Sequence, residues 1–520
     1  MKLNYKRTIL VGFAFFLICC FWQAYDTTIP LILTNKFGMS QTWSGVIMAL
    51  DNVLAVFMLP IFGALSDKCT HPRGRRTPFI VVGTLIAAVT LVVLAFVDTA
   101  QLKQLDAISA IDDPAALEEI YDRQAHTPLL TPSGERFTLS EKFTREEFAA
   151  IRSEITAEDG TTTTSMDYTR YVVPARQACA NDVVHQHPTT LIIFVVLLFI
   201  LLVSMSVFRS PAVALMPDVT PKPLRSKGNA IINLMGSAGG ILVLGLGMVF
   251  ATSATENSLM SYVGYFAVIA ALMLAALVVF MLTVREPEWA ADMQRQSLAA
   301  GIDEAAPETP AGESRKLSAD EVKSLLLILL SIVLWYFGYN AVASKYSVYA
   351  SNILHKDYNL TLIVAQAAAI VSYLPVGVLS SKIGRRKAIL AGVTMLTAAF
   401  AVAAFLKHDS PSLLMNAMFA LAGIGWATIN VNSFPMVVEL ASGSDVGKYT
   451  GFYYTASMAA QIATPMVSGM LMDRCGMWVL FPYAAVFTAL SFVTMFFVRH
   501  GDSKPVAKVG LEALDTPEGD

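Results

Sequence analysis

The chain consists of long apolar runs separated by short polar segments, apart from two longer polar stretches at residues 99–188 and 285–322. Each run reaches the length of about 20 mostly apolar residues that a helix needs to cross a membrane. Continuous runs of this length fit helices and not the alternating strands of a barrel. The pattern therefore predicts twelve membrane-spanning helices, at residues 8–33, 42–65, 78–98, 189–216, 228–252, 259–284, 323–350, 359–381, 387–407, 411–438, 449–472 and 477–499.

Composition supports a membrane protein and excludes several other classes. Hydrophobic residues make up 55% of the chain and charged residues 15%, against about 25% charged residues in a typical soluble domain. The net charge of −3 and the lack of a basic tract with interleaved aromatics argue against nucleic-acid binding. The five cysteines show no metal-ligand spacing, and there is no phosphate-binding glycine-rich loop. We therefore expect no enzyme activity, no metal and no organic cofactor.

The distribution of basic residues predicts the orientation of the spans. The first apolar run extends to Leu33 without a small-residue cleavage site, which favours a retained helix over a signal peptide. The short loops facing the other way carry only Lys36, Lys356, Lys407 and Arg474. Basic residues concentrate instead in the turns after spans two, four, eight and ten: Lys68, Arg73, Arg75, Arg76, Lys222, Arg225, Lys227, Lys382, Arg385, Arg386, Lys387 and Lys448. The positive-inside rule then places both termini in the cytoplasm of a multi-pass protein of the cell membrane.

The predicted spans and polar stretches divide the chain into four parts. Residues 1–284 form an N-terminal six-helix bundle, 285–322 a cytoplasmic linker, 323–499 a C-terminal six-helix bundle and 500–520 a cytoplasmic tail. The N-terminal bundle contains an extracytoplasmic insert at residues 99–188, in which 15 acidic residues outnumber 8 basic ones. We expect the insert to hold some structure but to be too small to fold firmly alone.

Two local patterns stand out in the insert, whose function the sequence does not reveal. Thr144 with Glu147 three residues later predicts a capped amphipathic helix over residues 143–155. Residues 127–138, around Pro132 and Gly134, predict a hairpin.

A repeated segment relates the two halves. Leu59-Pro60-Ile61-Phe62-Gly63-Ala64-Leu65-Ser66 in the second span matches Leu374-Pro375-Val376-Gly377-Val378-Leu379-Ser380 in the eighth, with a one-residue gap. A basic turn follows each copy. Weak internal symmetry of this kind is typical of transporters that rock two helix bundles about a site near the membrane midplane.

The whole chain resembles the major facilitator superfamily, and two segments resemble one branch of it. Gly63-x-x-Ser66-Asp67 with Gly74-Arg75-Arg76-x-Pro78-Phe79, and Asp218-Val-Thr-x-x-x-Leu224-Arg225-Ser-x-Gly-Asn229, are similar to plant sucrose–proton symporters and to glycoside–pentoside–hexuronide cation symporters. The resemblance implies two pseudo-symmetric six-helix bundles and cation-coupled sugar transport. Val213 stands where the plant symporters carry an arginine, and Arg209, one turn earlier, is the candidate substitute.

Charged residues inside the spans are candidates for ion coupling, because each costs roughly 2.5–3.5 kcal/mol at a helix centre on insertion scales. Asp26, Asp51 and Lys345 lie at similar depths from the outer ends of their spans. We expect Lys345 to pair with one of the two carboxylates, whose proton would exchange when the pair opens. The alternative is a set of near-interface charges that reach water. We expect H⁺ to be the coupling ion. Na⁺ is the alternative, because acidic residues can bind either ion.

Polar stripes on several spans provide candidates for solute contact, because a hydroxyl-rich ligand needs hydrogen-bond partners on an apolar wall. The alternative is that these residues hold helices together. Aromatic side chains in the same regions could stack on a sugar ring. The candidates are Gln23, Arg209, Asn233, Trp335, Tyr339, Asn340, Trp426, Asn430, Tyr454 and Gln461.

The first basic turn carries more than a topology signal requires, because it includes the acidic Asp67. Gly63, Asp67, Gly74, Arg75 and Arg76 could form a charge cluster that latches the cytoplasmic side in one state. A plain positive-inside signal accounts for Arg385 and Arg386 but not for an aspartate.

These observations predict a proton-coupled symporter of a glycoside or small oligosaccharide that works by alternating access. We expect a monomer whose partners are a small solute and the lipid bilayer. A proton-coupled exporter of drugs or metabolites is the main alternative, and a non-transporting membrane sensor is a second. The sugar hypothesis requires a cavity rich in hydrogen-bonding groups, whereas an exporter requires an apolar one.

Overall fold

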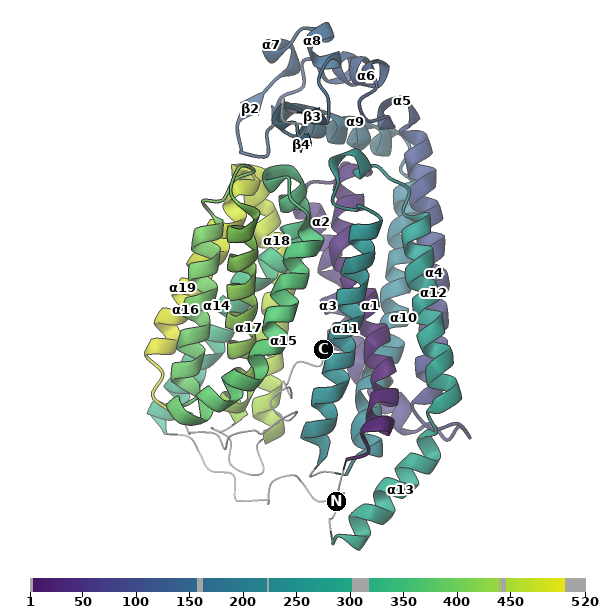
Figure 1. The fold of residues 1–520 in the computed structure, drawn as a ribbon, viewed down its shortest axis with the longest axis vertical. Coiled ribbons are helices and arrows are strands. Elements are labelled where there is room, and N and C mark those ends of the chain that lie inside the picture. Colours follow the sequence, from purple (N-terminus) through teal and green to yellow (C-terminus); the bar gives the residue numbers. More distant parts are fainter. Residues whose placement is uncertain are drawn as a thin grey trace.

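The computed structural model describes residues 3–156, 162–221, 224–301, 318–438, 440 and 446–500. It consists of two bundles of six spans beneath a small helical cap (Figure 1). We call the end that carries the cap the insert end, and the opposite end, where the first helix begins, the terminal end.

The N-terminal half contains six spans, the second of which is interrupted. These are α1 (Tyr5–Asn35), α2 (Gln41–Met48) with α3 (Leu50–Asp67), α4 (Thr77–Gln104), α10 (Thr189–Val219), α11 (Arg225–Val249) and α12 (Val263–Thr283). The interruption at Ala49 places Asp51 in the first turn of α3, where the partial positive charge of a helix N-terminus favours a carboxylate.

The C-terminal half contains the other six. These are α14 (Ala319–Tyr349), α15 (Tyr358–Ile383), α16 (Arg385–Ala403), α17 (Ser412–Val438), α18 (Val446–Cys475) and α19 (Leu480–Phe496). The predicted architecture of twelve spans in two bundles is confirmed. Of the twelve, ten are long and apolar enough over the described residues to cross a membrane on length and composition alone.

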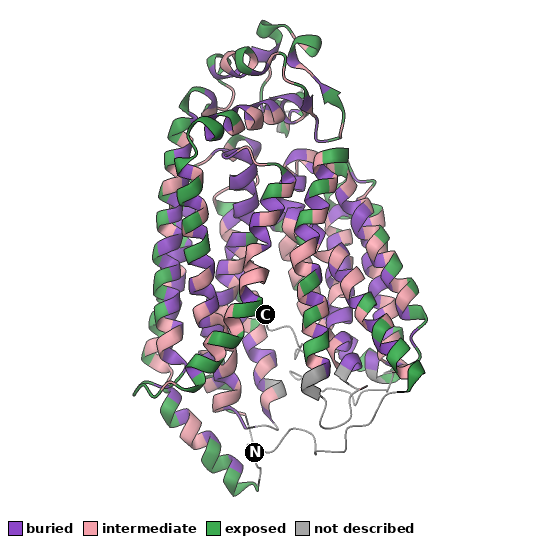
Figure 2. Cartoon of the chain, turned by 180° about the vertical axis from the view of Figure 1, so that it is seen from behind, coloured by how far each residue is buried: buried purple, intermediate pink, exposed green. Residues whose placement is uncertain are grey.

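Each half has its own apolar core. Figure 2 shows exposed residues along the outward faces of the helices, and many exposed residues are large and apolar. Phe57, Val89, Val371 and Leu413 are each more than 60% exposed. Apolar side chains that face outward in such numbers suit a hydrocarbon solvent. One buried ion pair, which the sequence did not indicate, fixes α1 to α4: Lys36 Nζ lies 2.6 Å from Asp98 Oδ2, and both side chains are fully buried.

The halves meet closely at the insert end, between α2 and α18. A Cβ added to Gly45 would lie 2.1 Å from the Pro465 carbonyl oxygen, and one added to Gly469 would lie 2.3 Å from that of Gln41. Small residues at these positions let the two backbones touch. Asp473 of α18 accepts hydrogen bonds from the Gln41 and Thr42 amides, each at 2.7 Å, and so caps the first turn of a helix in the other half.

The cap formed by the insert has a hydrophobic core of its own, which includes Leu117, Phe148 and Tyr168. Its elements are α5 (Asp106–Ser109), α6 (Pro114–Gln124), β1 (Leu129–Leu130), β2 (Arg136–Phe137), α7 (Leu139–Lys142), α8 (Arg145–Ala149), β3 (Glu154–Thr156), β4 (Thr162–Thr164), η1 (Tyr168–Val172) and α9 (Val173–Gln186). β1 and β2 pair antiparallel, and β3 and β4 do the same.

The two local predictions for the insert have different outcomes. The hairpin is confirmed, with Leu129 opposite Phe137 and Gly134 at a φ of +89° in its turn. The capping box of Thr144 and Glu147 is also confirmed, but its helix ends at Ala149. The prediction of a helix over 143–155 is wrong, because residues 154–156 pair with 162–164 as a strand instead.

Three short helices complete the connections: η3 (Thr255–Asn257), η4 (Ala350–Leu354) and η5 (Met477–Val479). The linker begins with α13 (Glu286–Ala299), which returns to the N-terminal half through an ion pair of 3.0 Å between Arg7 and Asp292. Residues 302–317 of the linker and residues 501–520 of the tail lie outside the described residues.

Candidate functional site

Two carboxylates and one guanidinium gather between the spans of the N-terminal half. Asp26 of α1 and Asp51 of α3 interact electrostatically with each other and with Arg209 of α10. The Arg209 guanidinium lies over the ring of Trp22, 5.5 Å from its centroid. The Asp51 carboxylate also accepts a hydrogen bond of 2.9 Å from Asn52. Sequence reasoning selected all three charged residues but assigned Arg209 to the solute.

Lys345 lies elsewhere. Its ammonium group donates a hydrogen bond of 2.7 Å to the Gln41 carbonyl oxygen, and the acidic residue that acts on it is Asp473. The expected pair of Lys345 with Asp26 or Asp51 is therefore wrong for this conformation. Similar depth along two helices does not bring two side chains together, because the direction in which each one points also matters. Lys345 instead joins the two halves at the insert end.

An aromatic pair from the C-terminal half faces the charged cluster. The rings of Tyr339 (α14) and Trp426 (α17) are stacked, with centroids 3.6 Å apart and planes 2° from parallel. Tyr339 is close enough to Asp26 for the two to interact electrostatically, so the aromatic pair lies near the carboxylates. Trp335, the third aromatic candidate, is fully buried in the core of its own half, so its ring faces contact protein only.

Two glutamines, one from each half, lie beside the same glycine of α11. A Cβ added to Gly240 of α11 would lie 3.1 Å from Gln366 Nε2 and 3.4 Å from Gln23 Oε1. Gln366 of α15 was not among the sequence candidates, although a glutamine inside an apolar span was a signal that could have identified it. The Gln366 Oε1, Asn340 Nδ2 and Asn430 Oδ1 atoms are buried without a hydrogen-bond partner. A buried polar atom without a hydrogen-bond partner lowers the stability of the fold, so these atoms are candidates for hydrogen bonds to a solute.

The remaining candidates lie on α11 and α18. Asn233 is half-buried on α11, and Gln461 is half-buried on α18. The Tyr454 ring packs against Phe434 and Tyr453. Their predicted roles in solute contact stay predictions.

The charge cluster expected at the first basic turn is present and is larger than predicted. Arg76, whose side chain is 5% exposed, binds Asp67 at 2.5 Å and Asp218 at 2.8 Å, and it also donates to the Ser66 hydroxyl. Arg75 forms a second, bidentate pair with Asp218, at 2.5 and 3.0 Å. Asp218 stood in the segment that resembles the sugar symporters, but no pattern in the sequence indicated that it meets this turn.

Glu286 of α13 completes the cluster. Its carboxylate accepts hydrogen bonds from the Arg76 and Thr77 amides at 2.9 and 2.8 Å and so caps the N-terminus of α4. Gly74 has a φ of +114°, and a Cβ there would lie 2.2 Å from Glu286, so both conformation and space require glycine. The cluster therefore consists of residues of the N-terminal half and of the first linker helix, α13. In the second basic turn, Arg385 and Arg386 donate to carbonyl oxygens of the C-terminal half.

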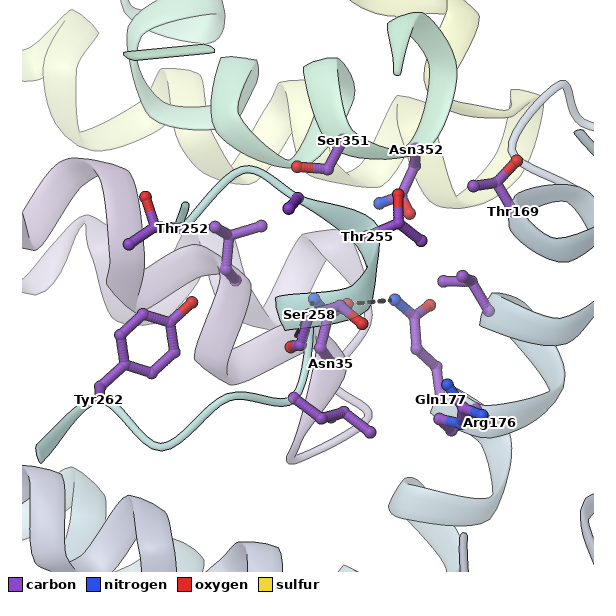
Figure 3. A pocket seen from close by; sticks show the side chains of 14 residues that line it. Asn35, Thr169, Arg176, Gln177, Thr252, Thr255, Ser258, Tyr262, Ser351 and Asn352 are labelled. Atoms are coloured by element: carbon purple, nitrogen blue, oxygen red, sulfur yellow. Dashed lines mark hydrogen bonds between the residues drawn. The ribbon is translucent and has the colours of Figure 1, made fainter. Parts of the chain in front are cut away.

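A pocket at the insert end is lined by three parts of the chain (Figure 3). Among its polar lining residues, the N-terminal half contributes Asn35, Thr252, Thr255 and Ser258, the insert contributes Thr169 and Gln177, and the C-terminal half contributes Ser351 and Asn352.

Across the described residues, no group of three or more His, Cys, Asp or Glu side chains is arranged to hold a metal ion.

Comparisons with known proteins agree with this architecture. The family model described as "Major Facilitator Superfamily" matches residues 178–366 and 328–516, and the one described as "MFS/sugar transport protein" matches residues 10–107. The inward-open xylose transporter XylE from E. coli superposes with a TM-score of 0.57 at 14% identity, over 98% of this chain and 99% of that one. At this identity the likeness concerns the fold alone.

Among curated proteins the matches are partial. The MFS-type transporter ppzB of Metarhizium rileyi (strain RCEF 4871) is 26% identical over 148 residues, which are 28% of this chain and 30% of that protein. Sucrose transport protein SUC4 of Arabidopsis thaliana is 34% identical over 60 residues, 12% of each chain. The chain thus matches less than a third of the length of either relative.

Proposed function

The chain belongs to the major facilitator superfamily, and from that premise we propose that it is a proton-driven symporter that imports a glycoside or small oligosaccharide by alternating access. The observation that carries the proposal is the central group of side chains. It combines two carboxylates that share one guanidinium with a stacked aromatic pair and amide groups that lack partners.

The proton is assigned from charge. Asp26 and Asp51 carry two negative charges and Arg209 one positive charge, so the ionised cluster has an excess of one negative charge among membrane spans. Binding of one proton makes the cluster neutral, and an uncompensated charge at this depth is costly. Movement between an outward-facing and an inward-facing state then carries that proton with the solute.

The sugar is assigned from the aromatic and amide side chains near the carboxylates. Sugars present apolar ring faces and many hydroxyl groups. The rings of Tyr339 and Trp426 provide an apolar surface, while Gln23, Gln366 and the unpartnered amide of Asn340 provide donors and acceptors. The sugar-transport family model that matches residues 10–107 and the segment similar to SUC4 support this class.

We further propose that the termini are cytoplasmic and that the structure is inward-facing. Basic residues gather in the turns at the terminal end, which the positive-inside rule places in the cytoplasm. The hydrogen bonds and backbone contacts described between the halves lie at the insert end and near the middle, whereas the charge clusters at the terminal end each stay within one half.

Uptake into proteoliposomes tests the proposal. A panel of labelled mono- and disaccharides is offered with an imposed pH gradient, a Na⁺ gradient or neither. We expect at least one glycoside to accumulate with the pH gradient and not with Na⁺ alone. Accumulation with a Na⁺ gradient alone would show that Na⁺, and not H⁺, is the coupling ion. Proton-driven efflux of apolar drugs without sugar uptake would favour the exporter.

A further inference from the structure

The insert is fixed to the N-terminal half at both of its ends. α4 leads into it and α9 leads out of it toward α10, and both flanking spans belong to that half. α9 also lies on the end of α1: Gln177 Nε2 donates to Asn35 Oδ1 at 2.9 Å, and Asn181 Nδ2 donates to the Gly38 carbonyl at 3.2 Å. With a hydrophobic core of its own, the insert is expected to move with this half as one body.

From this base the insert reaches the other half through its hairpin. The Met477 amide donates to the Pro132 carbonyl oxygen at 2.7 Å. A Cβ added to Gly134 would lie 2.1 Å from the Cys475 carbonyl oxygen, and one added to Gly476 would lie 2.6 Å from the Gly134 Cα. Both glycines have positive φ, +89° and +98°. Two turns from distant parts of the chain therefore fit together through backbone alone, which a larger residue on either side would prevent.

A second contact lies beside the pocket at the insert end. The Thr169 hydroxyl oxygen of the insert lies 3.2 Å from the ring Nε2 of His355, which follows η4 in the C-terminal half. Figure 3 shows the insert, the N-terminal half and the C-terminal half converging here, with Gln177 bonded to Asn35. The insert thus touches the C-terminal half at two separate places on the insert end.

We propose that the insert is a strap that closes the insert end: it is built on the N-terminal half, fastens to the C-terminal half at the Gly134–Gly476 contact, and must release for the transporter to open on that side. Rocking of the halves separates α2 from α18 at this end. A rigid body anchored to one half cannot keep backbone contact with the other during that movement. The inference rests on the proposed alternating-access transport.

A reversible cross-link tests the strap. Ser133→Cys is combined with the native, exposed Cys475 in a Cys69→Ser background, and the pair is joined by a short bis-methanethiosulfonate reagent. We expect sugar uptake to fall at least tenfold and to recover after reduction. The matched control joins Asp122→Cys to Arg145→Cys, across an exposed ion pair of 2.9 Å inside the insert, in a Cys475→Ser background. It should leave uptake unchanged.

A second measurement needs no transport. Ser44 of α2 is fully buried where α2 packs on α18, so labelling of Ser44→Cys by an impermeant maleimide reports opening of the insert end. Gly134→Val should raise the labelling rate roughly fivefold, the change expected for loss of about 1 kcal/mol of contact. Gly301→Val, at another positive-φ glycine with no atom near its Cβ position, should not change the rate.

The outcomes separate the two proposals. Cross-linked protein that transports at the uncross-linked rate, or Gly134→Val that labels no faster than the parent, would overturn the strap. Absence of sugar uptake in the parent protein, with labelling that still responds to Gly134→Val, would overturn the proposed function and leave the strap in place.

Discussion

Asp218, and not the more conspicuous Asp67, should be the acidic residue that holds the charge cluster together at the terminal end. Asp67 is 56% exposed and contributes one bond to Arg76. Asp218 is 14% exposed and accepts from both Arg75 and Arg76. An exposed pair is worth about 0–1 kcal/mol, whereas a hydrogen bond to a charged group in a buried setting contributes about 1.5–3 kcal/mol.

We therefore expect Asp67→Asn to change the free energy of unfolding by less than about 1 kcal/mol and Asp218→Asn to lower it by about 2–3 kcal/mol. The larger loss arises because the nearly buried Arg76 guanidinium keeps only an exposed acidic partner. The assay is thermal unfolding of both variants in the same detergent, followed by size-exclusion chromatography of the monomer peak. Glu286→Gln serves as a comparison, because it weakens the cap of α4 without removing a partner of Arg75.

Equal destabilisation by Asp67→Asn and Asp218→Asn would refute this reasoning, since it would mean that exposure does not govern the strength of these pairs. A larger effect of Asp67→Asn would show that the cluster is organised around the turn itself, as the sequence alone suggested.

Three further predictions follow from the insert end. Impermeant maleimide applied to intact cells should label the exposed Cys475 and not the buried Cys179, whereas labelling of Cys475 only after permeabilisation would reverse the proposed topology. Burial and the neighbouring His408 lower the pKa of His355 to about 4, while an opened strap returns this pKa toward about 6.5, so the open form binds the proton more tightly. Labelling of Ser44→Cys, divided by the labelling of a free thiol at the same pH, should therefore rise as the pH falls from 6.5 toward 4. His355→Asn should remove this rise. Lys345→Met should likewise raise that labelling by loosening the contact with Gln41, yet leave pH-driven accumulation in place; complete loss of accumulation would return Lys345 to the coupling site.

The spans were predicted well because membrane insertion requires a feature that is local in the sequence. A run of about 20 apolar residues is required wherever a helix crosses lipid, and no tertiary contact changes that requirement. The capping box at Thr144 and the hairpin around Gly134 were equally local and equally readable. The helix beyond Ala149 failed because pairing with residues 162–164 overrode its periodicity.

The sequence identified several residues of the candidate site but not which of them contact one another. A charge in an apolar span is visible in the sequence, so Asp26 and Asp51 were selected. Lys345 was selected with them, although it lies outside the site. Which of them meet depends on helix rotation and on the interruption at Ala49, neither of which the apolar pattern records. Asp218, Glu286 and Gln366 belong to segments far from their partners in the sequence, and only the packing of the helices brings them together.

Sugar accumulation by the Asp26→Asn variant in proteoliposomes decides whether Asp26 couples the proton to sugar uptake. With an inward proton gradient of one pH unit, one-to-one symport of a neutral sugar allows the parent protein up to about tenfold accumulation. We expect Asp26→Asn to lose this accumulation but still to exchange labelled for unlabelled sugar at equal concentrations, which requires no net proton movement. Normal accumulation by both Asp26→Asn and Asp51→Asn would contradict it.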